Sequence, residues 1–136
     1  MLYLIFEVNI KVKKRIKIIG LGAGGQTKNI IDILKKEKNY EIVGLIDKSQ
    51  KKEFINIPVV GKDKDLNIYF KKNIKNAFIG VANLEDTSKN KKIYEKLKKI
   101  GFNIINVIHS SACISDTTHL GEGIKVFAGC IINSGV

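Results

Sequence analysis

The sequence predicts an α/β fold, a small Rossmann-like parallel sheet with flanking helices, followed by the first hexapeptide repeats of a left-handed β-helix. Two observations predict it. Apolar, β-branched runs alternate with amphipathic segments as far as about residue 107. From Ile108 onward, apolar residues recur every six positions. We therefore expect a Rossmann-like domain over residues 12–107 and a β-helical segment over residues 108–136.

The first strand is expected over residues 12–21, where an isoleucine-rich run is typical of burial on both faces of a parallel sheet. Residues 20–25 then match the G-x-G-x-x-G pattern. Apolar positions between Thr27 and Lys36 are spaced as one face of a helix. A strand, a glycine loop and a helix start form the arrangement that binds phosphate on backbone N–H groups.

The alternation continues along the chain. Strands are expected over residues 40–46, 76–82 and 102–107, with a short extended piece over residues 57–61 and a charged loop over residues 48–53. Asp63 is expected to cap a short helix over residues 66–70. A longer helix is expected from Asp86 or Thr87 to about Lys99, with Gly101 ending it. Four strands that alternate with helices predict a doubly wound parallel sheet.

The C-terminal segment has a different period. The repeating apolar residues are Ile108, Ile114, Leu120, Val126 and Ile132. Neither a helix nor a plain strand has a six-residue period, whereas a left-handed β-helix has three hexapeptides in each coil. A solenoid needs several stacked repeats, so we expect residues 108–136 to be a truncated β-helix.

The chain is strongly basic, with a formal net charge of +11 and a pI of about 9.7. This charge indicates either an anionic partner or solvated, lysine-rich helix faces. The lysines are spread out and do not interleave with aromatic residues, which favours solvated faces and no nucleic-acid partner. Cys113 and Cys130 lie in apolar surroundings without C-x-x-C spacing, so we expect two buried free thiols and no metal.

Residues 1–11 are expected to be an N-terminal extension that is either disordered or upstream of the true start. They have no basic n-region and no small-residue cleavage site, which argues against a signal peptide. No run approaches the length of a membrane span. We therefore expect a cytoplasmic protein with no membrane partner.

Several stretches, in this order, resemble one known family. They are IIGLGAGGQTKNIIDIL, EIVGLIDKS, IPVVGKDKDL, IGVAN, KIYEKLKKIGFNIINVIHSSA and the hexapeptides from Ala112. Together they are similar to the bacterial sugar O- and N-acetyltransferases of the PglD/NeuD type. The resemblance implies a UDP-sugar-binding N-terminal domain, a β-helix that uses acetyl-CoA, and a homotrimer in the full-length family.

The resemblance also implies a set of substrate-binding residues at the glycine loop and at the ends of two strands. They are Gly22, Ala23, Gly24, Gly25, Gln26, Thr27, Lys28, Asp47, Lys48, Ala82 and Asn83. Asp47 would accept hydrogen bonds from a uracil N–H or a ribose hydroxyl. Gln26 and Thr27 replace the usual His-Gly pair of the family, and we expect Thr27 to narrow the pocket because it adds a Cβ.

No catalytic residue is transferred, because the family's catalytic histidine lies in a later coil of the β-helix. His109 is interpreted as a structural turn residue and His119 as a solvent-facing one. We therefore expect an acyltransferase relationship but no activity from this fragment alone. Three alternatives stay open: an NAD(P)-binding module with Asp47 on the ribose, a non-catalytic oligomerisation remnant, and a glycine turn with no ligand.

Overall fold

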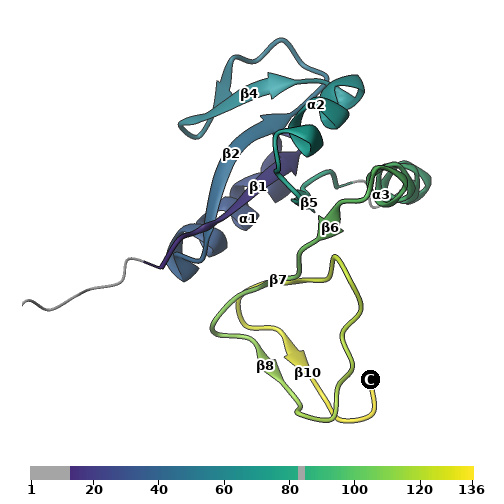
Figure 1. Ribbon diagram of the computed structural model, residues 1–136. Coiled ribbons are helices and arrows are strands. Elements are labelled where there is room, and N and C mark those ends of the chain that lie inside the picture. The colour runs from purple at the N-terminus through teal and green to yellow at the C-terminus, as the bar shows by residue number, and fades with distance from the viewer. Residues whose placement is uncertain (1–12, 83–84) are drawn as a thin grey trace, which may run out of the picture.

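The computed structural model describes residues 13–82 and 85–136 (Figure 1). The expected extension over residues 1–11 and the candidate residue Asn83 lie outside these ranges. No helix in the described ranges is long and apolar enough to span a bilayer.

A six-stranded sheet forms the centre of the fold, with the strand order β3-β4-β2-β1-β5-β6. Its strands are β1 (Ile16–Leu21), β2 (Tyr40–Ile46), β3 (Glu53–Phe54), β4 (Ile57–Gly61), β5 (Asn76–Ile79) and β6 (Asn103–Ile104). Every pairing is parallel except that of β3 with β4. The expectation of a mainly parallel α/β sheet is therefore confirmed.

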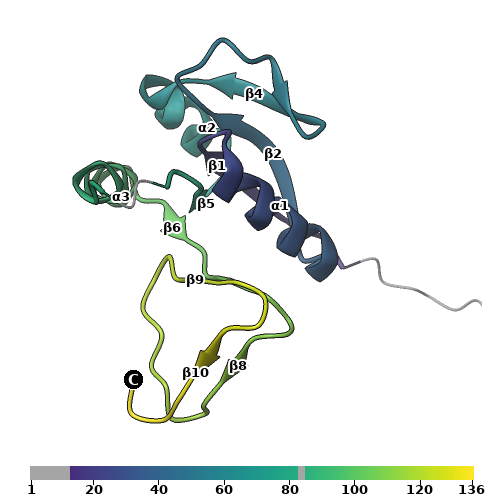
Figure 2. The same ribbon diagram turned by 180° about the vertical axis from the view of Figure 1, so that it is seen from behind.

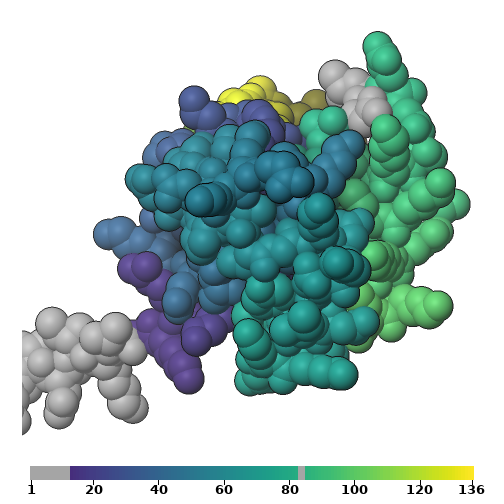
Figure 3. Space-filling model, turned by 90° about the horizontal axis from the view of Figure 1, so that it is seen from above, coloured from purple at the N-terminus to yellow at the C-terminus, as the bar shows by residue number. Residues whose placement is uncertain are grey.

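Helices cover both faces of the sheet (Figures 1 and 2). They are α1 (Gly25–Glu37), the short 3₁₀ turn η1 (Asp63–Asp65), α2 (Leu66–Lys71) and α3 (Ser88–Ile100). The apolar stripe of α1 packs with Ile18, Leu45 and Phe78 in one core cluster. Leu66 of α2 and Leu97 of α3 belong to a second cluster. Figure 3 shows α3, in green, beside the teal segment that includes α2.

Several boundaries differ from the expected ones. β1 begins at Ile16 rather than at residue 12, and the described residues just before it are exposed and charged. Asp65, not Asp63, accepts the hydrogen bond at the start of η1, from the Lys62 N–H at 2.8 Å. The expected strand over residues 102–107 is divided, because β6 ends at Ile104 and Val107 pairs elsewhere.

The antiparallel hairpin of β3 and β4 was not predicted from the sequence. Ile55 and Asn56 form its two-residue turn with φ values of 51° and 59°. Positive φ at both central residues is the geometry of a type I′ turn, which normally selects Asn-Gly. Isoleucine rarely adopts it, so the local sequence gives little sign of the turn.

The C-terminal segment forms two short parallel pairs. β7 (Val107–Ile108) pairs with β9 (Lys125–Val126), and β8 (Cys113–Ile114) pairs with β10 (Ile131–Ile132). Each pair joins residues 18 positions apart, such as Val107 with Lys125 and Ile114 with Ile132. This offset equals three hexapeptides. The left-handed β-helix itself stays a prediction.

The expectation of buried thiols was wrong, because Cys113 and Cys130 are both free and exposed. Cys113 precedes Ile114 in β8, and successive strand residues point to opposite faces. Cys130 follows a turn and precedes β10. Apolar neighbours in the sequence therefore did not indicate burial here.

Candidate functional site

The glycine loop connects β1 to α1 along a tightly constrained path. Gly22 has a φ of +98°, a region that favours glycine, and a Cβ there would lie 3.1 Å from Val81 Cγ2. Its N–H donates to the Ile46 carbonyl at 2.8 Å. Next to it, the Gly80 N–H donates to the Leu21 carbonyl at 2.7 Å. The loop is therefore held between the carboxyl ends of β2 and β5.

The N-terminus of α1 has no side-chain cap among the described residues. Gly24 is the N-cap residue, with extended backbone, and within residues 13–82 and 85–136 no side chain accepts a hydrogen bond from the first turn. The first N–H groups of a helix have no partner within the helix, and the helix dipole adds partial positive charge at this end. This terminus can therefore bind an anion.

Asp47, which directly follows β2, binds the other side of the loop. Its Oδ1 accepts a hydrogen bond from the Ala23 N–H at 3.1 Å, and its Oδ2 accepts one from the Ser49 N–H at 3.0 Å. Lys51 Nζ donates to the Ala23 carbonyl at 2.8 Å. Partial burial raises the pKa of Asp47, but the hydrogen bonds from Ser49 and Ala23, with the nearby Lys51 charge, outweigh it and hold the pKa below its ordinary value.

Thr27 lies beneath the loop and not at the pocket wall. It is fully buried, and its hydroxyl proton is shared between the carbonyls of Gly22 at 2.9 Å and Gly80 at 3.2 Å. A Cβ at Gly80 would collide with Thr27 Oγ1. Thr27 thus fastens the loop to the end of β5, and the structure does not place its side chain where it would narrow the pocket.

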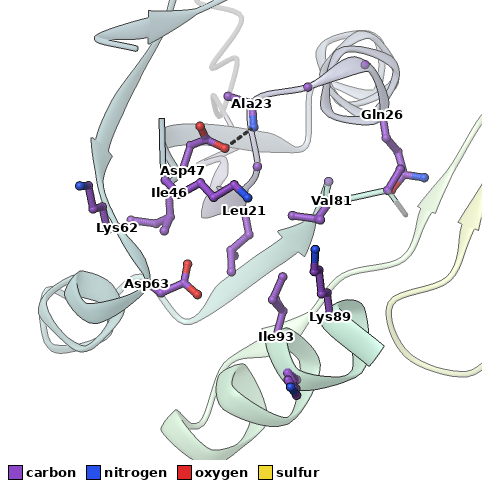
Figure 4. Close-up of a pocket in the computed structure, with 17 residues that line it drawn as sticks. Leu21, Ala23, Gln26, Ile46, Asp47, Lys62, Asp63, Val81, Lys89 and Ile93 are labelled. Atoms are coloured by element: carbon purple, nitrogen blue, oxygen red, sulfur yellow. Dashed lines mark hydrogen bonds between the residues drawn. The ribbon is translucent and has the colours of Figure 1, made fainter. Parts of the chain in front are cut away.

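A cavity of about 600 Å³ opens beside the glycine loop (Figure 4). Its floor includes the apolar side chains of Leu21, Ile46 and Val81. In Figure 4, Lys62 and Asp63 approach from the β4–η1 side, whereas Lys89 and Ile93 rise from α3. The lining contains four lysines and two carboxylates: Lys48, Lys62, Lys89, Lys92, Asp47 and Asp63.

Most of the candidate residues expected from the sequence line this cavity. Those at its wall are Gly22, Ala23, Gly24, Gly25, Gln26, Asp47, Lys48 and Ala82. Thr27 and Lys28 do not line it, since Thr27 is buried below the loop and Lys28 lies farther along α1. Asn83 lies outside the described residues. Which of these residues bind a ligand stays a prediction.

Sequence reasoning missed the contribution of α3 and of the segment after β4. The lysines of the helices were expected on solvated faces, and Lys89 and Lys92 are indeed exposed. They also line the cavity beside Ile93, which was not expected. Their i, i+3 spacing places both on one side of the helix. Which side of α3 faces the cavity depends on how the helix packs on the sheet. That packing involves residues far apart in the sequence, so the helix sequence alone does not predict it.

A long-range contact joins the cavity wall to the C-terminal segment. Lys125 Nζ of β9 donates to Gln26 Oε1 at 2.8 Å and to the Ile79 carbonyl at 3.1 Å. Desolvation by burial lowers the pKa of Lys125. This lysine therefore bridges the first turn of α1 and the end of β5.

The histidines take part in no visible catalytic arrangement in the described part of the chain. His109 Nδ1 lies 2.8 Å from Ser111 Oγ and also accepts a hydrogen bond from the Ser111 N–H at 3.0 Å. Ser111 Oγ in turn accepts one from the Gly129 N–H at 3.1 Å. These contacts fit the interpretation of His109 as a turn residue. His119 is exposed, as expected.

Known proteins share the sequence pattern and the fold of this chain. A family model described as the PglD N-terminal domain matches residues 17–97. Among solved structures, a perosamine N-acetyltransferase mutant from Caulobacter crescentus, in complex with CoA and GDP-perosamine, superposes with a TM-score of 0.80 at 29% identity, over 87% of this chain and 54% of that one. No curated protein sequence matches.

Two further structures share the fold. The acetyltransferase domain of PglB from Neisseria gonorrhoeae, in complex with acetyl coenzyme A, superposes with a TM-score of 0.78 at 22% identity, over 90% of this chain and 58% of that one. UDP-D-quinovosamine 4-dehydrogenase from Vibrio fischeri has a TM-score of 0.57 at 21% identity, over 67% of this chain and 76% of that one. The chain thus spans little more than half the length of the two acetyltransferases.

Proposed function

The chain belongs to the PglD/NeuD-type sugar acetyltransferase family, and on that premise we propose that its cavity binds the nucleoside diphosphate of a nucleotide-linked sugar. The family resemblance implies a UDP-sugar. The perosamine N-acetyltransferase structure contains GDP-perosamine, which supports the class of nucleotide sugars.

One observation carries the proposal: the uncapped start of α1 and four lysines face the same cavity. A diphosphate has negative charge and many acceptor oxygens, so it would accept hydrogen bonds from the first N–H groups of α1. Lys48 follows β2 and Lys62 follows β4, whereas Lys89 and Lys92 belong to α3. A cavity of about 600 Å³ also falls in the size range of sites for small ligands.

Asp47 is the proposed contact for the nucleoside. Each of its oxygens already accepts one backbone N–H, and a carboxylate oxygen has a second lone pair. Its lowered pKa keeps it ionised at neutral pH, so it acts only as an acceptor. A uracil N–H or a ribose hydroxyl supplies the matching donor.

We propose that this binding serves acetyl transfer from acetyl-CoA to an amino or hydroxyl group of the sugar. The acetyltransferase structures with bound CoA or acetyl-CoA support this cofactor. We propose a binding role for these 136 residues without acetyl transfer by them alone, because the family resemblance places none of the catalytic residues among them. The cytoplasmic location, a left-handed β-helix over residues 108–136 and a homotrimer in the full-length family belong to the same proposal.

Isothermal titration calorimetry tests the proposed ligand. The purified chain is titrated separately with UDP-N-acetylglucosamine, GDP-mannose, NAD and CoA. We expect a UDP-sugar to bind. A thermal-shift measurement with the UDP-sugar at 100 times its Kd should then show that the folded state is more stable by about 2.7 kcal/mol. Asp47→Ala should weaken this binding, whereas Asp32→Ala on the exposed side of α1 should not.

Each other outcome points to a different function. Binding of GDP-mannose alone would support a nucleotide-sugar ligand but show that the nucleotide is GDP rather than UDP. Binding of NAD alone would favour the dinucleotide module. A chain that binds none of the four ligands but associates as its concentration rises would favour the oligomerisation remnant. Turnover of acetyl-CoA with a UDP-amino sugar would contradict the expected inactivity.

A further inference from the structure

Lys125 is the one described residue of the C-terminal segment that hydrogen-bonds to a side chain lining the cavity. It lies 99 positions from Gln26 in the sequence, yet Nζ and Oε1 are 2.8 Å apart. The same ammonium donates to the carbonyl of Ile79, immediately before the cavity-lining residues that follow β5. Lys125 thus contacts two neighbouring parts of the cavity wall.

The chemistry of this contact fixes the orientation of the Gln26 amide. An ammonium has three donors and no acceptor, so it can bind only the oxygen end of the amide. The NH₂ end then points away from Lys125. Within the described ranges, Gln26 Nε2 has no hydrogen-bond partner. Since Gln26 lines the cavity, its NH₂ group is the end that can meet a ligand.

We propose that Lys125 is a positioning residue of the ligand site: it holds the oxygen of Gln26 so that the amide NH₂ is presented as a donor to acceptor oxygens of the bound nucleotide sugar. This inference rests on the proposed function. Without Lys125, the Gln26 amide would rotate and present its oxygen to the ligand for part of the time. Acceptor-rich ligands such as a diphosphate would then lose a fixed donor.

The burial of Lys125 supports a specific role. Its ammonium is partly desolvated, and both of its hydrogen-bond acceptors are neutral oxygens rather than carboxylates. Burying a cation without an opposite charge costs free energy. A methionine of similar length would fill the same space without that cost, so the charge is better explained by what it orients than by stability.

A double-mutant cycle tests the proposal. The Kd for a UDP-sugar and for a GDP-sugar is measured with the whole chain for wild type, Lys125→Met, Gln26→Met and the double variant. Lys125→Met should weaken binding about tenfold, the equivalent of one hydrogen bond to a charged ligand. In the Gln26→Met background the same change should have no further effect. Lys96→Met, an exposed lysine of α3 away from the cavity, is the matched control.

The outcomes separate this inference from the proposed function. Equal losses from Lys125→Met in both backgrounds, or no loss at all, would overturn the positioning role while leaving nucleotide-sugar binding intact. A wild-type chain that binds neither sugar nucleotide would overturn the proposed function and the inference with it.

A ligand-free measurement provides a second readout. The ¹⁵N side-chain amide signal of Gln26, assigned by its loss in Gln26→Met, should be ordered in wild type and become mobile in Lys125→Met. An unchanged signal would contradict the ordering of Gln26 by Lys125. Urea denaturation of each variant shows whether the fold itself has changed.

Discussion

At the scale of single residues, the glycine loop is held by polar side chains beneath it and beside it. Thr27 donates to the carbonyl of Gly22 in the loop and to that of Gly80 just after β5, and Asp47 accepts the Ala23 N–H. Glycines permit the path of the loop, but these contacts select it among the many paths that glycine allows. The loop is therefore already ordered before a ligand arrives.

We expect Asp47→Asn to lower the free energy of unfolding by about 1 kcal/mol at pH 7, because an amide has one acceptor oxygen and can accept only one of the two backbone N–H groups. The folded state holds the pKa of Asp47 below its ordinary value, so the carboxylate stabilises the fold above that value and loses this effect as the pH falls. The difference between wild type and variant should therefore shrink below about pH 4.

Urea denaturation at several pH values measures this difference. Asp32→Asn is the control, since its carboxylate pairs with Lys36 on the exposed face of α1. This control should change stability by less than about 0.5 kcal/mol. A difference for Asp47→Asn that stays constant from pH 7 to pH 3 would contradict the role of the charge.

At the scale of secondary structure, α3 has two functions on different faces. Leu97 is fully buried against the sheet and attaches the helix to the core. At its C-terminal end, Lys98 pairs with Glu122 at 2.8 Å, and Glu122 also accepts the Ile104 N–H at 2.9 Å. These contacts fix the rotation of the helix, and the rotation places Lys89 and Lys92 at the cavity.

We expect the double variant Lys89→Glu/Lys92→Glu to weaken binding of a UDP-sugar about tenfold or more, because two favourable charges near the diphosphate become unfavourable. The salt dependence of Kd should decrease at the same time. Titration calorimetry at low and high salt measures both effects.

The matched control changes the same net charge on the same helix. Lys96→Glu/Lys99→Glu alters two exposed lysines that do not line the cavity. It should have a much smaller effect, since screening weakens charges beyond about 10 Å at 0.1 M salt. Equal losses for the two double variants would show that only overall charge matters.

At the scale of the whole molecule, the C-terminal segment is buried against the sheet domain through β7 and β9. Val107 belongs to the core cluster beneath α1, and Val126 of β9 is only 3% exposed. Ile131 of β10, farther along, is 71% exposed. The pairs thus become less buried with distance from the sheet.

We therefore expect Val126→Asp to lower the free energy of unfolding by about 3 kcal/mol, because a carboxylate would replace a buried apolar side chain. Ile131→Asp, in an equivalent parallel pair but exposed, should stay within about 0.5 kcal/mol of wild type. Urea midpoints measure both. Equal effects would show that the two pairs are buried to the same extent in solution.

Much of the fold could be predicted, because its signals are local. The isoleucines of β1, the glycines after it and the apolar stripe of α1 lie close together in the sequence. The family resemblance was confirmed by the match over residues 17–97. The turn at Ile55 and Asn56 could not be predicted, because the pairing of β3 with β4 imposes it and these two residue types do not favour it.

The sequence by itself determined the strand, glycine loop and helix start, and it determined Asp47 as the acid at the end of β2, because sterics and periodicity act over a few residues. Only the tertiary structure decided that Thr27 lies under the loop, that Lys89 and Lys92 face the cavity, and that Lys125 reaches Gln26. Those positions depend on helix rotation and on contacts between segments up to 99 residues apart, and no local pattern encodes them.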